Sequence, residues 1–216
     1  MDDSLKLDHL NLESYEHNDL NVRCFAMMLN KTTQCYKFYW LEAIVELLPD
    51  KNEITYAEIV DEMLWDAWFT VTKYHLRLGP IIEGKSENNI EHAIHLIEND
   101  PEVVQPMRKN LLFSIIEKDR GLLKNDYKKI ETYVPYRLLS PFVDLKGGDP
   151  RWDSNKSKLI KYINGYDGLP YYIVKNSSGD YSIRVDKKWR RFILDNSVII
   201  KSWIQMNKIK CQTANC

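Results

Sequence analysis

The chain has 216 residues, of which 44% are hydrophobic and 28% charged, the balance of a globular protein and not of a disordered one. No apolar run is long enough to cross a membrane, and the acidic N-terminus lacks the basic and apolar segments of a signal peptide. The four cysteines form no dense framework, so we expect a reducing, cytoplasmic setting without membrane association.

The charge is unevenly distributed along the chain, although the net charge is only −1. Residues 1–149 carry a net charge of −9, and residues 150–216 carry +8. Two explanations remain open. The two parts can attract one another within one fold, which is the more ordinary case, or the basic end can bind an anionic partner such as DNA.

The segment 36–48 is predicted to be the central helix of the fold. Residues 1–20 read as a polar lead-in, and 21–29 as a short first helix. In 36–48 apolar residues recur at helical spacing on nearly every side, and only Glu42 and Glu46 form a polar stripe. A helix that is apolar almost all round is a buried one, so we expect the other helices to pack around it.

Several further helices are predicted in the first two thirds of the chain. Thr55 and Glu58 have the spacing of a capping box, which starts an amphipathic helix. Proline and glycine punctuation then separates the remaining segments. Helices are expected over 86–99, 106–118 and 122–133, followed by a proline-bounded connector over 134–142.

The C-terminal third is predicted to contain a β-hairpin. Residues 169–175 and 180–185 are rich in Tyr, Ile and Val and flank the four-residue turn 176–179. A short basic helix is expected before the hairpin, over 155–162, and a final helix after it, over 188–206.

These elements predict a mainly α fold, a helical bundle around one buried central helix, with a small C-terminal β-hairpin plus helix. Residues 147–150, Gly-Gly-Asp-Pro, are the best boundary between a helical domain, 1–148, and a basic hairpin-plus-helix subdomain, 149–216. One continuous domain is the other possibility.

No metal or cofactor site is predicted from the histidines and cysteines. His92 and His95 share a helix face, but a third ligand is missing, so we expect a solvated face. Cys211 and Cys216 lack a second ligand pair and read as a frayed tail. Cys24 and Cys35 lie among apolar residues and read as small core fillers.

Two candidate sites for nucleic-acid chemistry remain. Glu83 and Lys85 fit the Glu-x-Lys half of a metal-dependent nuclease motif with Asp66 upstream, but that motif belongs on strands and these residues read as helix end and loop. The basic run Lys187, Lys188, Arg190 and Arg191, which surrounds Trp189, is the candidate phosphate-binding patch. Those basic groups can also simply form the solvent-exposed side of the helix, without binding a ligand.

Three segments carry a family resemblance: 35–44 (CYKFYWLEAI), 54–80 (beginning ITYAEIVDEMLWDAW) and 134–142 (VPYRLLSPF). Their order resembles the N-terminal, non-catalytic region of bacterial HNH-endonuclease domain proteins. In that group the helical region and a small hairpin and helix come first, and the nuclease module comes last. The resemblance implies a role in a bacterial DNA-cleaving defence or mobile-element system.

The resemblance carries no catalytic residue over to this chain. An HNH site needs a His base, an Asn that orients it and a metal-binding His or Asp, but all five histidines lie within residues 9–95. We therefore expect a non-catalytic module that binds DNA or a partner, such as a separate catalytic chain. The alternatives are a cryptic metal-dependent nuclease that uses Asp66, Glu83 and Lys85, and a structural protein-interaction scaffold.

Overall fold

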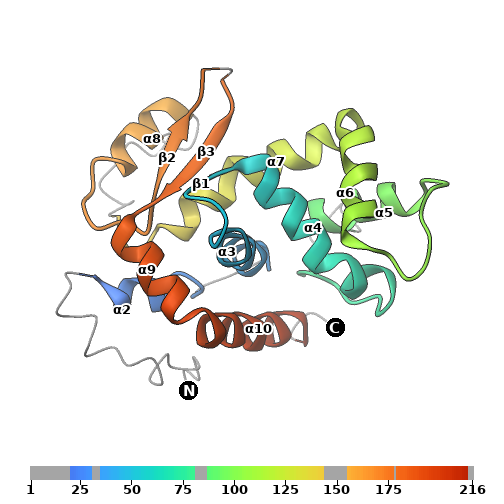
Figure 1. Cartoon of the computed structure of the whole chain (residues 1–216), viewed down its shortest axis with the longest axis horizontal. Helices are drawn as coiled ribbons and strands as arrows, with labels where there is room; N and C mark the ends of the chain where they lie inside the picture. Colours follow the sequence, from blue (N-terminus) through green and yellow to red (C-terminus); the bar gives the residue numbers. More distant parts are fainter. Residues whose placement is uncertain (1–19, 31–34, 81–86, 144–154, 178, 214–216) are drawn as a thin grey trace.

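The computed structural model describes residues 20–30, 35–80, 87–143, 155–177 and 179–213. These residues form a mainly helical protein with one small antiparallel sheet, which confirms the predicted fold class (Figure 1). The elements in chain order are α2 (Val22–Met27), α3 (Tyr36–Leu47), β1 (Glu53–Thr55), α4 (Tyr56–Thr72), α5 (Asn89–Glu98), α6 (Lys109–Lys118), α7 (Arg120–Leu138), α8 (Lys156–Ile163), β2 (Tyr171–Lys175), β3 (Tyr181–Val185), α9 (Lys187–Asp195) and α10 (Ser197–Thr213).

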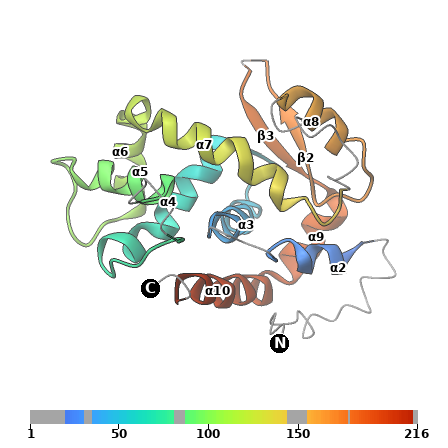
Figure 2. The same cartoon turned by 180° about the vertical axis from the view of Figure 1, so that it is seen from behind.

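Helix α3 lies at the centre of the molecule, as the apolar pattern predicts. It packs against α4, α7 and α10, and both cartoon views show it enclosed by them (Figures 1 and 2). Trp40 is 0% exposed, and its ring meets Tyr56 of α4 edge-on, with 5.3 Å between ring centroids. The core of the protein is therefore built around this helix.

The capping box at the start of α4 is also confirmed. The Thr55 hydroxyl accepts a hydrogen bond from the Glu58 amide at 3.2 Å, and the Glu58 carboxylate accepts one from the Thr55 amide at 2.8 Å. This pair satisfies two of the amides that every helix start leaves without an intrahelical partner.

The predicted hairpin is present, and it pairs with a third strand from the acidic part of the chain. Strands β2 and β3 are antiparallel with Ile173 opposite Ile183, and β1 pairs on the other side of β3, with Ile54 opposite Ile183. Strand β1 has only three residues, too few to show an alternating pattern in the sequence. The predicted boundary at 147–150 lies outside the described residues.

The open edge of β2 is covered by a side chain of the preceding helix segment. The Asn164 amide accepts from the Ile173 backbone N–H at 3.0 Å and donates to the Ile173 carbonyl at 2.7 Å. It thereby takes the place of a further strand on β2.

The proline-bounded connector predicted over 134–142 is wrong in its first half. Helix α7 continues through Pro135 and ends at Leu138. Pro135 lies in the last helical turns and is buried, and its carbonyl accepts a hydrogen bond from the Tyr171 hydroxyl at 2.6 Å. Packing against the sheet therefore outweighs the loss of one backbone hydrogen bond.

The single final helix predicted over 188–206 is two helices, α9 and α10, separated at Asn196. The Asn196 side chain donates to the Phe192 carbonyl at 2.9 Å and so occupies an acceptor at the end of α9. The change of direction lets α9 pack near α2 while α10 runs along α3 (Figure 2). None of the helices in the described segments has both the length and the apolar character needed to span a bilayer.

Candidate functional site

Helix α9 carries the predicted phosphate-binding patch, and local capping fixes where it starts. The Asp186 carboxylate accepts from the backbone amides of Lys188 at 2.9 Å and Trp189 at 3.2 Å. On the inner side Trp189, Phe192 and Ile193 are buried. Helical spacing then directs Lys187, Lys188 and Arg191 outward, and all three are exposed.

Arg190, the fourth predicted residue, points away from this patch and into the fold. Its guanidinium donates to the carbonyls of Leu48 and Pro49, each at 3.1 Å. These carbonyls follow the last turn of α3, where acceptors lack an intrahelical donor and a cation is favoured by the helix dipole. The structure thus separates Arg190, which caps the central helix, from the three exposed cations. We call Lys187, Lys188 and Arg191 the α9 patch.

Within the α9 patch, Arg191 lies near a carboxylate of its own helix. Arg191 Nε lies 3.7 Å from Asp195 Oδ2, one turn later on the same helix. An exposed ion pair of this length is weak and screened by salt, so it leaves the patch positive overall.

Three other basic residues of the C-terminal part form ion pairs with carboxylates of the acidic part, residues 1–149. Ion pairs join Arg184 to Glu53 at 2.9 Å and Lys201 to Glu46 at 2.7 Å. A third joins Lys208 to Glu42, and both of its residues are 5% exposed. These contacts favour the first explanation of the charge asymmetry, attraction within one fold.

The interface between α3 and α10 is polar, which the sequence did not predict. Glu42, part of the polar stripe predicted on 36–48, is buried and accepts from Lys208 and from the Gln205 amide. Gln212 donates to the Tyr39 hydroxyl at 3.0 Å, and burial raises the pKa of that hydroxyl. The Lys208 ammonium also lies 4.0 Å from the centroid of the Tyr39 ring.

One weak signal of this interface exists in the sequence. Lys201, Gln205, Lys208 and Gln212 recur at helical spacing and form a polar stripe along α10. Such a stripe is normally read as the solvent face. Only the matching carboxylates of α3 turn it inward.

Asp66, from the nuclease alternative, faces the same interface from α4. Its Oδ2 atom is buried without a hydrogen-bond partner in the described part of the chain. Burial raises the pKa of Asp66 well above 3.8; neighbouring Glu42 raises it further, Lys208 opposes this, and Glu62 and Glu46 add smaller increases. Metals bind the ionised carboxylate, and burial disfavours that form of Asp66. Glu83 and Lys85 lie outside the described residues.

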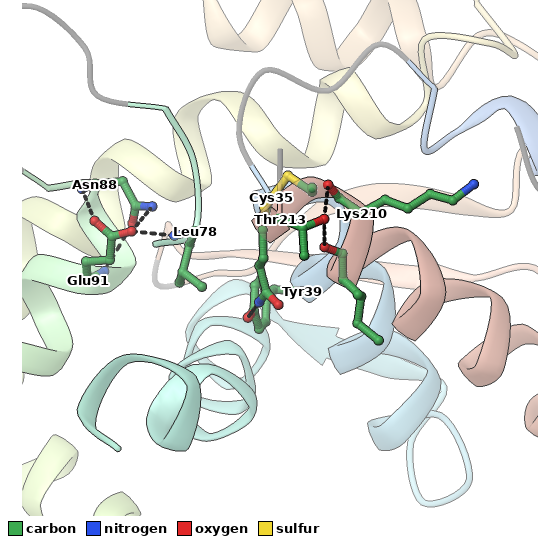
Figure 3. The surroundings of a disulfide bond; sticks show 10 residues. Cys35, Tyr39, Leu78, Asn88, Glu91, Lys210 and Thr213 are labelled. Atoms are coloured by element: carbon green, nitrogen blue, oxygen red, sulfur yellow. Dashed lines mark hydrogen bonds between the residues drawn. A yellow bond between two sulfur atoms is a disulfide. The ribbon is translucent and has the colours of Figure 1, made fainter. Parts of the chain in front are cut away.

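The cysteines also differ from the prediction. Cys35, expected to be an unpaired core filler, forms a disulfide with Cys211, which was assigned to a frayed tail (Figure 3). Their Cα atoms are 6.2 Å apart, although 176 residues separate them in sequence. Sequence could not indicate the pair because no local pattern links the start of α3 to the end of α10. Cys24 is a free thiol whose pKa is raised by burial.

His92 and His95 lie on α5, each half-exposed and hydrogen-bonded to a carboxylate. His92 Nδ1 is 2.9 Å from Asp126 Oδ2, and His95 Nδ1 is 2.6 Å from Glu87 Oε2. No group of three or more potential metal ligands occurs among the residues with described positions.

Comparison with known proteins adds no relative. The chain matches no known protein-family model, and no curated protein or solved structure matches it either. The resemblance to the N-terminal region of HNH endonucleases therefore remains an expectation from the sequence.

Proposed function

We propose that this protein is a non-catalytic module that binds the phosphate backbone of duplex DNA through the α9 patch. The observation that carries the proposal is the division of basic residues in the C-terminal part. Arg184, Arg190, Lys201 and Lys208 hold the fold together, whereas the α9 patch presents three cations to solvent.

The chemistry of the patch suits phosphate contacts without base recognition. Exposed lysine and arginine side chains neutralise phosphates, release counterions and read no sequence. Helix α9 is anchored by a buried aromatic cluster, in which Phe25 stacks on Trp189 at 5.3 Å and meets Phe192 edge-on at 5.7 Å. The three cations of the α9 patch are thus carried by a helix whose other face is fixed in the core.

Two observations, one from the sequence and one from the structure, support a non-catalytic role in this proposal. The chain carries no HNH constellation, and the raised pKa of Asp66 opposes the metal-ligand role of the nuclease alternative. On this proposal the DNA is cut, if at all, by a separate catalytic chain that this module accompanies.

The test is a titration of labelled random duplex at several salt concentrations. We expect weak binding at low salt that is lost near physiological salt, with a slope of about 0.9 log units of affinity per log unit of salt for each phosphate contacted. The variant K187A/K188A/R191A should lower this slope by about 2–3. The matched control K158A/K161A removes two exposed lysines of α8 and should leave most of the slope in place.

Three results would change the proposal. An unchanged slope in the α9 variant would place the contact elsewhere, and no binding at low salt would favour the interaction scaffold, in which the charges only join the two parts. Nicking of supercoiled plasmid with Mg²⁺ or Mn²⁺ that disappears in E83A would favour the cryptic nuclease.

A further inference from the structure

The last turns of α10, from Gln205 to Thr213, lack the apolar packing that holds the first half of the helix. Ile200, Trp203 and Ile204 are buried in the first half, but the only buried residues after them are Lys208 and Gln212. The aliphatic side chains of this second half point outward, since Met206 is 47% and Ile209 57% exposed.

The buried side chains of this second half make polar contacts. Lys208 pairs with Glu42, and Gln212 donates to the Tyr39 hydroxyl. A buried ion pair gains little net stability because both charges must first be desolvated. The Cys35–Cys211 disulfide therefore adds a covalent restraint where the buried side chains of α10 make only polar contacts.

The two cysteines are held very differently. Cys35 is 0% exposed, and its amide donates to the Leu78 carbonyl at 2.9 Å. The Leu78 amide in turn donates to the buried Glu91 carboxylate, which belongs to the capping box of α5 with Asn88 (Figure 3). Cys211 lies in the last turn of α10 and is partly exposed. Breaking the bond would therefore move the α10 end and leave Cys35 in place.

We propose that the Cys35–Cys211 disulfide is a thiol-reversible latch that holds residues 205–213 over Tyr39 and Glu42. A dithiol reductant attacks the more accessible sulfur, that of Cys211, through one thiolate. The protein S–S bond breaks, and Cys35 leaves as a thiolate that takes up a proton. The second thiol of the reductant then breaks the mixed disulfide and frees Cys211 as a thiol. Two electrons pass to the protein, and the reductant becomes a disulfide.

The latch opens one half of a helix and not the whole fold. After reduction Trp203 and Ile204 still anchor the first half of α10 in the core. Residues 205–213 then exchange between docked and undocked states, and undocking brings solvent to Tyr39 and Glu42. Local opening of this kind is a property of segments with few buried apolar contacts.

The experiment is amide hydrogen exchange read by mass spectrometry on the oxidised full chain, with and without dithiothreitol. We expect exchange within 205–213 to rise about tenfold or more on reduction, with much smaller changes in α3 and in 197–204. The double variant C35S/C211S should show the fast exchange without reductant. The control C24S, which removes a thiol outside this bond, should behave as wild type.

Thiol counting on the same samples completes the test. Oxidised protein should gain two reactive thiols on treatment with dithiothreitol. No gain would show that the bond does not form, and unchanged exchange within 205–213 after a confirmed gain would show that it does not restrain the helix. Faster exchange over the whole chain would show that the disulfide stabilises the whole fold and not only the end of α10. Each of these results overturns the latch.

Discussion

Helices α9 and α10 follow one another in the chain yet use their residues in opposite ways. On α9 the aromatic side chains face inward and the cations of the α9 patch face solvent. On the second half of α10, Lys208 and Gln212 are buried, while Met206 and Ile209 are exposed. The two helices therefore give lysine two different roles, surface charge on α9 and internal pairing on α10.

The difference comes from what each helix packs against. Helix α9 meets the Phe25 ring of α2, so its aromatic stripe is the favourable side to bury. Helix α10 meets the carboxylates Glu42 and Glu46 of α3, so its polar stripe is the favourable side there. Buried charge is tolerated only where a partner of opposite charge is fixed in place.

The largest expected effect tests the inner face of α9. Trp189 is 0% exposed and its Nε1 donates to the Gly168 carbonyl at 2.9 Å. W189A should therefore lower the free energy of unfolding by about 3–5 kcal/mol. I209A on the outer face of α10 should change it by less than about 0.5 kcal/mol. Urea denaturation of both variants measures the difference. Similar losses of stability would show that Trp189 of α9 and Ile209 of α10 do not differ in burial as described.

The second prediction compares a lysine from each helix. K208M leaves Glu42 buried without its cation, and we expect a loss of about 3 kcal/mol, the lower end for a broken buried pair, because Gln205 still donates to Glu42. K187M on α9 should change stability by less than about 0.5 kcal/mol.

The double variant E42Q/K208M sharpens this comparison. It removes both charges and should recover most of the stability lost in K208M, since an uncharged pair carries no unpaired buried charge. A double variant no more stable than K208M would mean that Lys208 acts through packing and not through its charge.

The smallest expected effect concerns pH. Because the pKa of Asp66 is raised in the folded state, folding takes up a proton, so stability is full below about pH 4 and is lost as pH rises through the raised pKa. D66N cannot ionise and should lack this loss. The melting temperatures of wild type and D66N should agree at pH 4 and separate toward alkaline pH, with the variant higher. A constant difference at all pH values would show that Asp66 does not titrate as its surroundings indicate.

The sequence alone identified the elements whose signal is local. The apolar surround of 36–48, the Thr55–Glu58 capping box and the hairpin near 171–185 were predictable, because helical spacing, capping and turn chemistry act within a few residues. The outward direction of the α9 patch also followed from the spacing around Trp189. The prediction from proline positions was wrong at Pro135, where tertiary packing outweighs local preference and α7 continues through the proline near its end.

Only the tertiary structure decided which charged residues serve the fold. Arg190 looks like its neighbours in sequence but caps α3, and Lys208 looks like a surface lysine but pairs with Glu42 in the interior. The Cys35–Cys211 bond likewise joins residues 176 apart. These roles depend on partners brought together by long-range packing, and the spacing of residues along one segment carries no information about the segment that will face it.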